Sequence, residues 1–294
     1  MSKSVSFSQF STYLQCPNKW KLDYIEKRRA YQPSIHTCFG TAFHNTVQTY
    51  LSTMYSESAK KADQMDLGGM LKEQMFTEYK NNQEKLNEHF SSPQELAEFH
   101  RDGVAILEYF RKKRSLYFKA KKQELIGIEV PLEVEIKPGV VFKAFLDIVV
   151  KDLATNKIKI LDFKTSTRGW TDKEKKDMGK TSQLILYKSY YSQIFGVDKD
   201  DIDVEFLIVR RKINEDAEFV PKRIQSFKPA AGSVTVKKVN KAFEEFVKTA
   251  FKDDGEYNVD NQYPAYENSN CKWCEYYKND ELCPVKNRIK NGGK

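Results

Sequence analysis

Apolar residues in the first third of the chain recur at the spacing of amphipathic helices. Phe39, Phe43, Val47 and Met54, for example, are four or seven positions apart and share one helix face. This pattern continues through most of residues 1–123, which we expect to form a helical region carrying Cys16 and His44. The predicted helices cover residues 7–27, 38–54, 70–90 and 94–118.

The pattern changes to strands after Glu124. Two apolar segments flank the turn Lys137-Pro138-Gly139 and predict a hairpin. Residues 124–252 are therefore expected to form an α/β core. Its predicted strands cover residues 125–132, 141–150, 157–165, 203–211 and 218–227, and its predicted helices cover 180–195 and 233–251.

The tail, residues 253–294, is rich in Asp, Asn, Tyr and Cys and is expected to be irregular. We found no internal repeat or low-complexity tract. Gly179-Lys180-Thr181 resembles the end of a phosphate-binding loop, but Glu174 occupies the position where that motif needs glycine. A nucleotide-binding loop is therefore excluded.

Composition favours a globular protein with a polyanionic partner. Of the 294 residues, 40% are hydrophobic and 31% charged, enough for one packed core with elaborations and too apolar for a disordered chain. The net charge of +8 favours a partner such as DNA, although we expect about half of the basic clusters to be ordinary solvated surface. The clusters are Lys112, Lys113 and Arg114; Lys119, Lys121 and Lys122; Lys173, Lys175 and Lys176; and Arg210, Arg211 and Lys212.

Cysteine usage and hydropathy predict a cytoplasmic protein. No apolar run approaches the roughly 18 residues of a membrane span, and the N-terminus lacks a signal sequence, so no membrane partner is expected. Five cysteines are an odd number for a disulfide framework. Cysteine as a metal ligand in a reducing compartment fits better.

Two carboxylates and an ammonium are predicted to meet on the sheet. Side chains alternate along a strand, so Asp162 and Lys164 share one face while Phe163 points to the other. Asp147 lies on the preceding strand. Carboxylates bind Mg²⁺, and a nearby cation assists phosphodiester hydrolysis. An ordinary salt bridge is the alternative, but charge within so apolar a strand usually has a function.

The order His44, Asp147, Asp162-Phe163-Lys164, Gln183 and Tyr187 resembles the PD-(D/E)xK nucleases of the RecB and Cas4 type, including phage recombination exonucleases. The resemblance spans Ser6 to Cys283. It implies a restriction-endonuclease-like core, with a mixed sheet flanked by helices, a helical N-terminal elaboration and a C-terminal cysteine cluster that packs back on the N-terminus.

The resemblance also implies roles for single residues. His44, Asp147, Asp162 and the backbone carbonyl of Phe163 would coordinate Mg²⁺ or Mn²⁺, and Lys164 would orient or activate the attacking water. Gln183 and Tyr187, four residues apart on a helix, would contact the DNA strand. Glu129 is either an added ligand or a solvent-facing residue.

The sequence departs from the family pattern at two positions. Leu146 stands where the family has proline, and Asp162 where the longer glutamate is usual; both departures keep the carboxylates. In the loop after the motif, Arg168 suits a backbone phosphate. Trp170 either stacks on an unpaired base or caps the core.

Four cysteines are predicted to form one metal centre. Cys271 and Cys274 form a C-x-x-C knuckle, and Cys283 follows. The resemblance implies that Cys16 completes a [4Fe–4S] site with these three. Zinc stays open, because four thiolates suit it as well. Cys38 has no place in this scheme and is expected to be a buried thiol.

The sequence thus predicts a Mg²⁺- or Mn²⁺-dependent deoxyribonuclease. The resemblance implies an exonuclease that processes DNA ends in recombination, repair or replication, in a bacterial or phage-infected cell. A helicase or recombination protein is the partner it suggests. The alternative is a non-catalytic DNA-binding subunit that keeps the nuclease fold. Strand polarity and the choice between single- and double-stranded DNA stay open.

Overall fold

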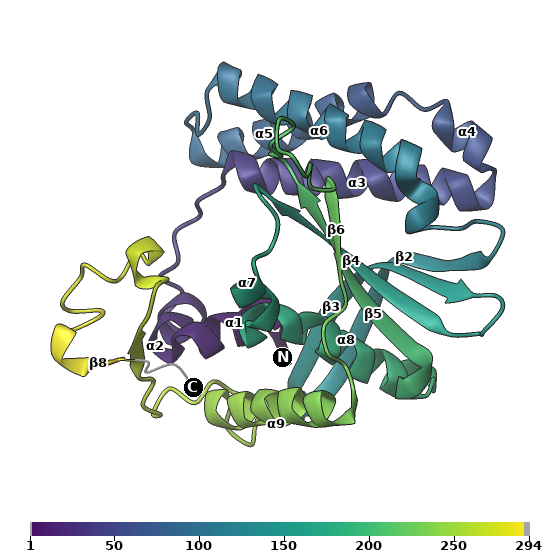
Figure 1. The fold of residues 1–294 in the computed structure, drawn as a ribbon. Helices are drawn as coiled ribbons and strands as arrows, with labels where there is room; N and C mark the ends of the chain where they lie inside the picture. The colour runs from purple at the N-terminus through teal and green to yellow at the C-terminus, as the bar shows by residue number, and fades with distance from the viewer. Residues whose placement is uncertain (1, 291–294) are drawn as a thin grey trace.

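The computed structural model describes residues 2–290, which fold around a six-stranded mixed sheet with helices on both faces (Figure 1). This confirms the fold class expected from the sequence. The strands are β1 (Lys3–Val5), β2 (Gln123–Lys137), β3 (Val140–Asp152), β4 (Ile158–Ser166), β5 (Ile202–Arg210) and β6 (Ile224–Phe227).

Strand β3 is the centre of the sheet's topology. The hairpin partner β2 runs antiparallel along the whole of one edge of β3. The other edge is shared by β1, which pairs in parallel with the first residues of β3, and by β4, which pairs antiparallel with its last residues. Strand β5 then continues the sheet parallel to β4, and β6 is antiparallel to β5.

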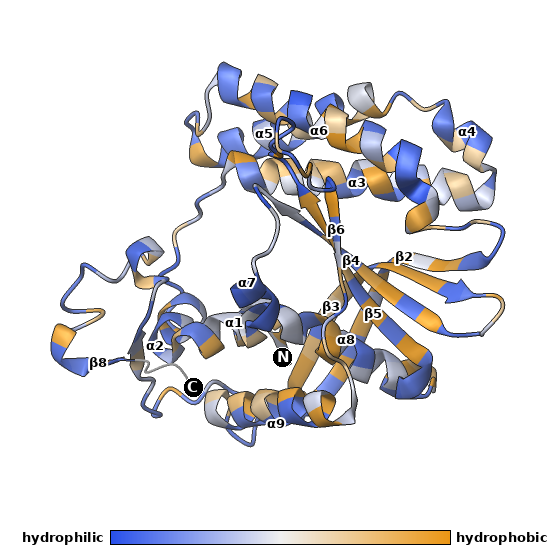
Figure 2. Cartoon of the chain, viewed as in Figure 1, coloured by the Kyte–Doolittle hydropathy of each residue, from blue (hydrophilic) through white to orange (hydrophobic). Residues whose placement is uncertain are grey.

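Each face of the sheet has its own helical layer. One layer packs on Leu161 and Phe163, and the other packs on Phe142 and Ile160. Figure 2 shows hydrophobic residues concentrated on the strands, whereas α7 is hydrophilic. The first layer contains α3 (Ile35–Ser56), α4 (Ala59–Asp63), α5 (Leu67–Leu86) and α6 (Pro93–Lys113); the second contains α1 (Phe7–Gln15), α8 (Met178–Phe195) and α9 (Ser233–Ala250).

The predicted helix over residues 7–27 is broken at Cys16. The helix α1 ends there, and α2 (Pro17–Trp20) and a π-helical turn (Lys21–Ile25) follow. Cys16 has extended backbone angles, φ −162° and ψ 106°. The cause is Pro17, because the residue before a proline is disfavoured in helical conformation. The break leaves Cys16 outside both helices.

Other boundaries also differ from the prediction. The strand expected over residues 218–227 is formed only from Ile224, since Pro221 cannot donate to a ladder. The predicted helices 70–90 and 94–118 end at Leu86 and Lys113. Short elements were not predicted at all: β1, α4, α7 (Asp172–Lys176), β7 (Ala265–Glu267), β8 (Arg288–Lys290) and the 3₁₀ turns Arg114–Leu116, Lys199–Asp201, Cys271–Trp273 and Val285–Asn287.

The tail lies against the segment around Cys16. The backbone N–H of Asn18 donates to the Pro264 carbonyl at 3.1 Å, and the Tyr276 hydroxyl donates to Asp23 Oδ1 at 2.8 Å. Strands β7 and β8 pair in parallel within the tail. Residues 291–294 of the predicted tail region lie outside the described residues. None of the described helices has the length and apolar character needed to cross a membrane.

The helical layer on α3 depends on a close contact at Gly103 of α6. A Cβ at this position would lie 2.4 Å from Leu71 Cδ2 and 2.8 Å from Phe39 Cε2, and both side chains are buried. We expect Gly103→Ala to destabilise the protein by about 1 kcal/mol, because overpacking outweighs the gain in helix propensity. Thermal melting measures this.

The matched control is Gly68→Ala, whose Cβ would meet Val104 at an ordinary 3.4 Å. This variant should melt at or above the wild-type temperature. Equal melting temperatures for the two variants would contradict the proposed close packing at Gly103.

Candidate active site

Three acidic residues form a row across β2, β3 and β4. The ladder between β3 and β4 ends at the pair Ile148 and Leu161, so the next pair in register is Asp147 and Asp162. On the other edge of β3, Ile128 pairs with Ile148 and Val130 pairs with Leu146. Glu129 therefore lies across from Asp147. The carboxylates therefore meet where the two central strands separate.

Asp162 is buried, and one of its carboxylate oxygens has no partner. The residue is 1% exposed, and within residues 2–290 its Oδ1 accepts no hydrogen bond. Its Oδ2 forms an ion pair with Lys164, whose Nζ lies 2.8 Å away. The predicted shared face of Asp162 and Lys164 is thus seen, with Phe163 buried in the opposite core. A buried carboxylate oxygen without a donor is costly, and a bound metal ion would relieve the part of that cost that Lys164 leaves.

Asp147 accepts a hydrogen bond from the backbone of the neighbouring strand β4. The N–H of Phe163, which lies beyond the end of the β3–β4 ladder, donates to Asp147 Oδ2 at 2.8 Å. Burial, followed by the charge of Asp162, raises the pKa of Asp147 well above its usual value. Burial alone would lower the pKa of Lys164, but Asp162 and Asp147 outweigh it and raise that pKa.

His44 lies on α3, and its side chain reaches Asp147. Its Nδ1 lies 3.4 Å from Asp147 Oδ2. Burial lowers the pKa of His44, which keeps the imidazole neutral near neutral pH and leaves a nitrogen lone pair available. Gly40, one turn earlier, faces β4, and a Cβ there would lie at an ordinary 3.4 Å from Thr165 Oγ1.

Glu129 is hydrogen-bonded to Gln48, a residue that was not predicted from the sequence. Gln48 Nε2 donates to Glu129 Oε1 at 2.5 Å. Gln48 follows His44 by four residues on α3, and this spacing was the available signal. Glu129 also has a left-handed backbone, with φ +51°.

The helix α8 contributes Gln183 and Tyr187 from the other layer. Gln183 Nε2 donates to the Tyr187 hydroxyl at 2.9 Å. Burial, with a contribution from the charge of Asp162, raises the pKa of Tyr187 above its usual value. The hydroxyl therefore stays protonated, and with Gln183 as its donor it can give its own proton to another acceptor.

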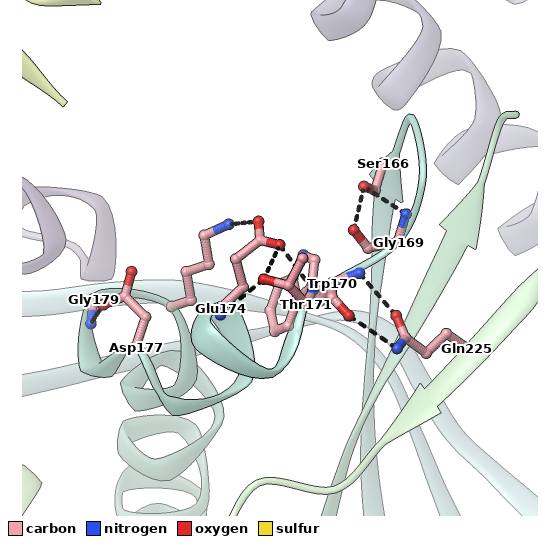
Figure 3. Close-up of polar contacts among 9 residues, drawn as sticks. Ser166, Gly169, Trp170, Thr171, Glu174, Asp177, Gly179 and Gln225 are labelled. Atoms are coloured by element: carbon pink, nitrogen blue, oxygen red, sulfur yellow. Dashed lines mark hydrogen bonds and ion pairs between the residues drawn. The ribbon is translucent and has the colours of Figure 1, made fainter. Parts of the chain in front are cut away.

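The loop after β4 is fixed by Gln225 of β6. Gln225 accepts from the Trp170 N–H at 2.8 Å and donates to the Trp170 carbonyl at 3.1 Å (Figure 3). The Trp170 indole packs on Phe206 and Phe227, the core-capping arrangement left open by the sequence. Arg168 is exposed on this loop.

Two residues of one predicted basic cluster form ion pairs with acidic residues of the same protein. Arg211 Nη1 lies 2.8 Å from Glu98 Oε1 and 2.6 Å from Asp102 Oδ2, and Lys212 pairs with the same two carboxylates. These contacts join the end of β5 to α6. Arg211 and Lys212 thus neutralise acidic residues of the protein and contribute little to a surface for a polyanion.

Four cysteines line one cavity between the N-terminal segment and the tail. The cavity has a volume of about 240 Å³ and is bordered by Cys16, Cys271, Cys274 and Cys283. Backbone N–H groups donate to two of the sulfurs, from Tyr266 to Cys16 at 3.4 Å and from Asn268 to Cys271 at 3.3 Å.

Cys38 lies elsewhere, 1% exposed on α3, which confirms that it is buried.

Across residues 2–290, no three His, Cys, Asp or Glu side chains are arranged to hold a single metal ion as they stand. At the carboxylates, Lys164 occupies the place beside Asp162. At the other candidate centre, the four thiols border one cavity.

Comparison with known proteins gives one family. A sequence model of the PD-(D/E)XK nuclease superfamily matches residues 4–283. No curated protein gives a significant match. Among solved structures, one named "Putative exonuclease" from Eubacterium rectale is similar with a TM-score of 0.44 and 10% identity, over 83% of this chain and 78% of that one.

The buried charge of Asp147 predicts a stability effect in metal-free protein. Folding raises the pKa of this carboxyl group, so the folded protein loses stability as the pH rises toward that pKa. In EDTA, Asp147→Asn should therefore have a higher melting temperature than wild type at pH 8, and the difference should shrink in acid. Asp152→Asn is the control, because the Thr155 backbone N–H lowers the pKa of Asp152 and no gain is expected. A variant at Asp147 that melts at or below wild type would contradict this reading.

Proposed function

Because the chain belongs to the PD-(D/E)XK nuclease superfamily, we propose that it is a divalent-metal-dependent deoxyribonuclease acting at the carboxylate row. The observation that carries the proposal is the buried carboxylate of Asp162, whose Oδ1 has no hydrogen-bond donor among the described residues, beside Asp147 and His44. Hard oxygen ligands with one neutral imidazole suit Mg²⁺ or Mn²⁺.

The residues that would hold the metal are Asp147, Asp162, His44 and the backbone carbonyl of Phe163, with Glu129 as a further carboxylate. When bound, the ion supplies Lewis-acid polarisation of a phosphate oxygen and a more acidic water. The neutral state of His44 keeps its nitrogen available for this task. Burial, and then the repulsion from Asp162, raise the pKa of Asp147, and both unfavourable terms favour uptake of a cation.

Lys164 and Tyr187 supply the charges and protons around the scissile phosphate. Lys164 stays an ammonium, because the two carboxylates raise its pKa, and it orients or activates the attacking water. Tyr187 accepts from Gln183 and therefore directs its own proton to a phosphate oxygen. Both groups stabilise negative charge that develops during hydrolysis.

DNA is the proposed substrate. The net charge of +8 favours a polyanion, and exposed Arg168 next to the site suits a backbone phosphate. Trp170 packs on the core, so a base would reach only the part of the indole that stays open.

We propose exonuclease action on DNA ends in recombination, repair or replication, with a helicase or recombination protein as partner. A non-catalytic DNA-binding subunit is the second candidate, which the intact set of Asp147, Asp162 and Lys164 disfavours.

Removal of the catalytic charge should separate cleavage from binding. We expect Lys164→Ala to lower cleavage of end-labelled DNA in Mg²⁺ or Mn²⁺ by about 100-fold or more, since it removes a group acting on the transition state. DNA affinity should stay within a few fold, because phosphate contacts come from many basic residues. Lys143→Ala, at an exposed lysine of the neighbouring strand β3, is the control. Wild-type cleavage rates for Lys164→Ala would refute the site.

We propose that the cysteine cavity holds a [4Fe–4S] cluster, with zinc as the alternative. The position of all four cysteines around one cavity supports a thiolate-bound centre, and the family resemblance favours the cluster. Backbone N–H donors to Cys16 and Cys271 suit thiolates of a cluster. The centre would join the N-terminal segment to the tail and have a structural role.

Loss of one ligand should destabilise the whole chain. Cys16→Ser should lose the metal and lower stability by about 4 to 5 kcal/mol, by analogy with the loop-closure estimate for a disulfide of similar span. Cys38→Ser, a buried thiol outside the cavity, should keep the metal. Absorption near 400 nm, metal analysis and melting check this. A colourless protein with one zinc would refute iron only, and a stable metal-free protein would refute the centre.

A further inference from the structure

Gln48 makes a direct contact with the acidic row from a position that the proposed chemistry does not use. It is 8% exposed, and its Nε2 donates to Glu129 Oε1 at 2.5 Å. Gln48 and His44 are one turn apart on α3, so the two side chains lie on the same helix face. A single helix therefore touches both Asp147, through His44, and Glu129, through Gln48.

Glu129 has a backbone conformation that is unusual for a strand residue. Four described residues other than glycine have a positive φ: Lys27, Asn87, Glu129 and Asn156. Asn87 ends α5, Asn156 lies in the turn before β4 and Lys27 follows the π-helical turn, whereas Glu129 lies within a strand. A left-handed residue interrupts the regular alternation of side chains, and such a conformation persists where its surroundings enforce it.

The chemistry of an amide suits this task. Gln48 donates one hydrogen bond to one oxygen of Glu129 and adds no charge, so the carboxylate keeps its negative charge and its second oxygen. A lysine or arginine in the same place would neutralise Glu129 and compete with a cation. Partners of this kind set the orientation of metal-binding carboxylates in proteins.

We propose that Gln48 is a positioning residue that holds the Glu129 carboxylate in the acidic row, and that it thereby sets the affinity of the site for a divalent cation. The inference rests on the proposed function, because Glu129 has this importance only within a metal site.

The test is calorimetric titration of the full-length protein with Mn²⁺, without DNA. Gln48→Leu removes the donor, and Gln48→Met removes it at nearly the same side-chain length. Both should weaken Mn²⁺ binding by about tenfold or more, the usual size of such second-layer effects. Gln74→Leu is the matched control, because Gln74 pairs with Asn45 of α3 at 3.1 Å and does not contact Glu129. Its Mn²⁺ affinity should equal that of wild type.

A double-mutant cycle separates positioning from a general structural effect. In a Glu129→Gln background, Gln48→Leu should change the Mn²⁺ affinity by less than about twofold, since its effect acts through the lost carboxylate. Equal losses in both backgrounds would overturn the proposal, as would wild-type affinity in Gln48→Leu and Gln48→Met.

The same samples keep this inference apart from the proposed nuclease activity. A wild-type protein that binds Mn²⁺ but cleaves no DNA refutes the nuclease proposal, and the calorimetry still decides on Gln48. A wild-type protein that cleaves DNA, with Gln48→Leu binding Mn²⁺ normally, refutes the role of Gln48 alone. A wild-type protein that binds no Mn²⁺ overturns both.

Discussion

The structure of the site depends on one unfavourable interaction, the burial of two neighbouring carboxylates where β3 and β4 separate. Asp162 Oδ1 has no hydrogen-bond donor among the described residues, and the charge of Asp162 adds to burial in raising the pKa of Asp147. Lys164 compensates part of this charge from the same strand. The sheet is stable around these groups because both of its faces are covered by apolar layers, which also exclude the water that would otherwise solvate them.

The helix α3 connects the two halves of this arrangement. Gly40 lies beside β4, His44 reaches Asp147, and Gln48 reaches Glu129. These three residues are four positions apart, so one helix face serves one row of strand residues. From the opposite layer, α8 brings the paired Gln183 and Tyr187. The site is thus assembled from the regular periodicities of helix and strand, and rigid elements hold most of its groups.

Sequence patterns predicted the parts that depend on periodicity. The alternation in β4 placed Asp162 and Lys164 on one face, and the helical spacing placed α3 and α8 nearly to their ends. The break at Cys16 was missed, although Pro17 signals it, because the apolar spacing continues through the break. The left-handed backbone of Glu129 and the pairing of Arg211 with Glu98 and Asp102 depend on tertiary contacts, which no local pattern contains.

The most direct test of this account is a crystal structure of the protein soaked in Mn²⁺, with anomalous diffraction to locate the ion. The account predicts a peak between the carboxylates of Asp147 and Asp162, within coordination distance of His44, with Lys164 moved away from Asp162. A peak only at other surface carboxylates, or none at millimolar Mn²⁺ with Lys164 still paired to Asp162, would contradict the claim that the buried acidic row is a metal site.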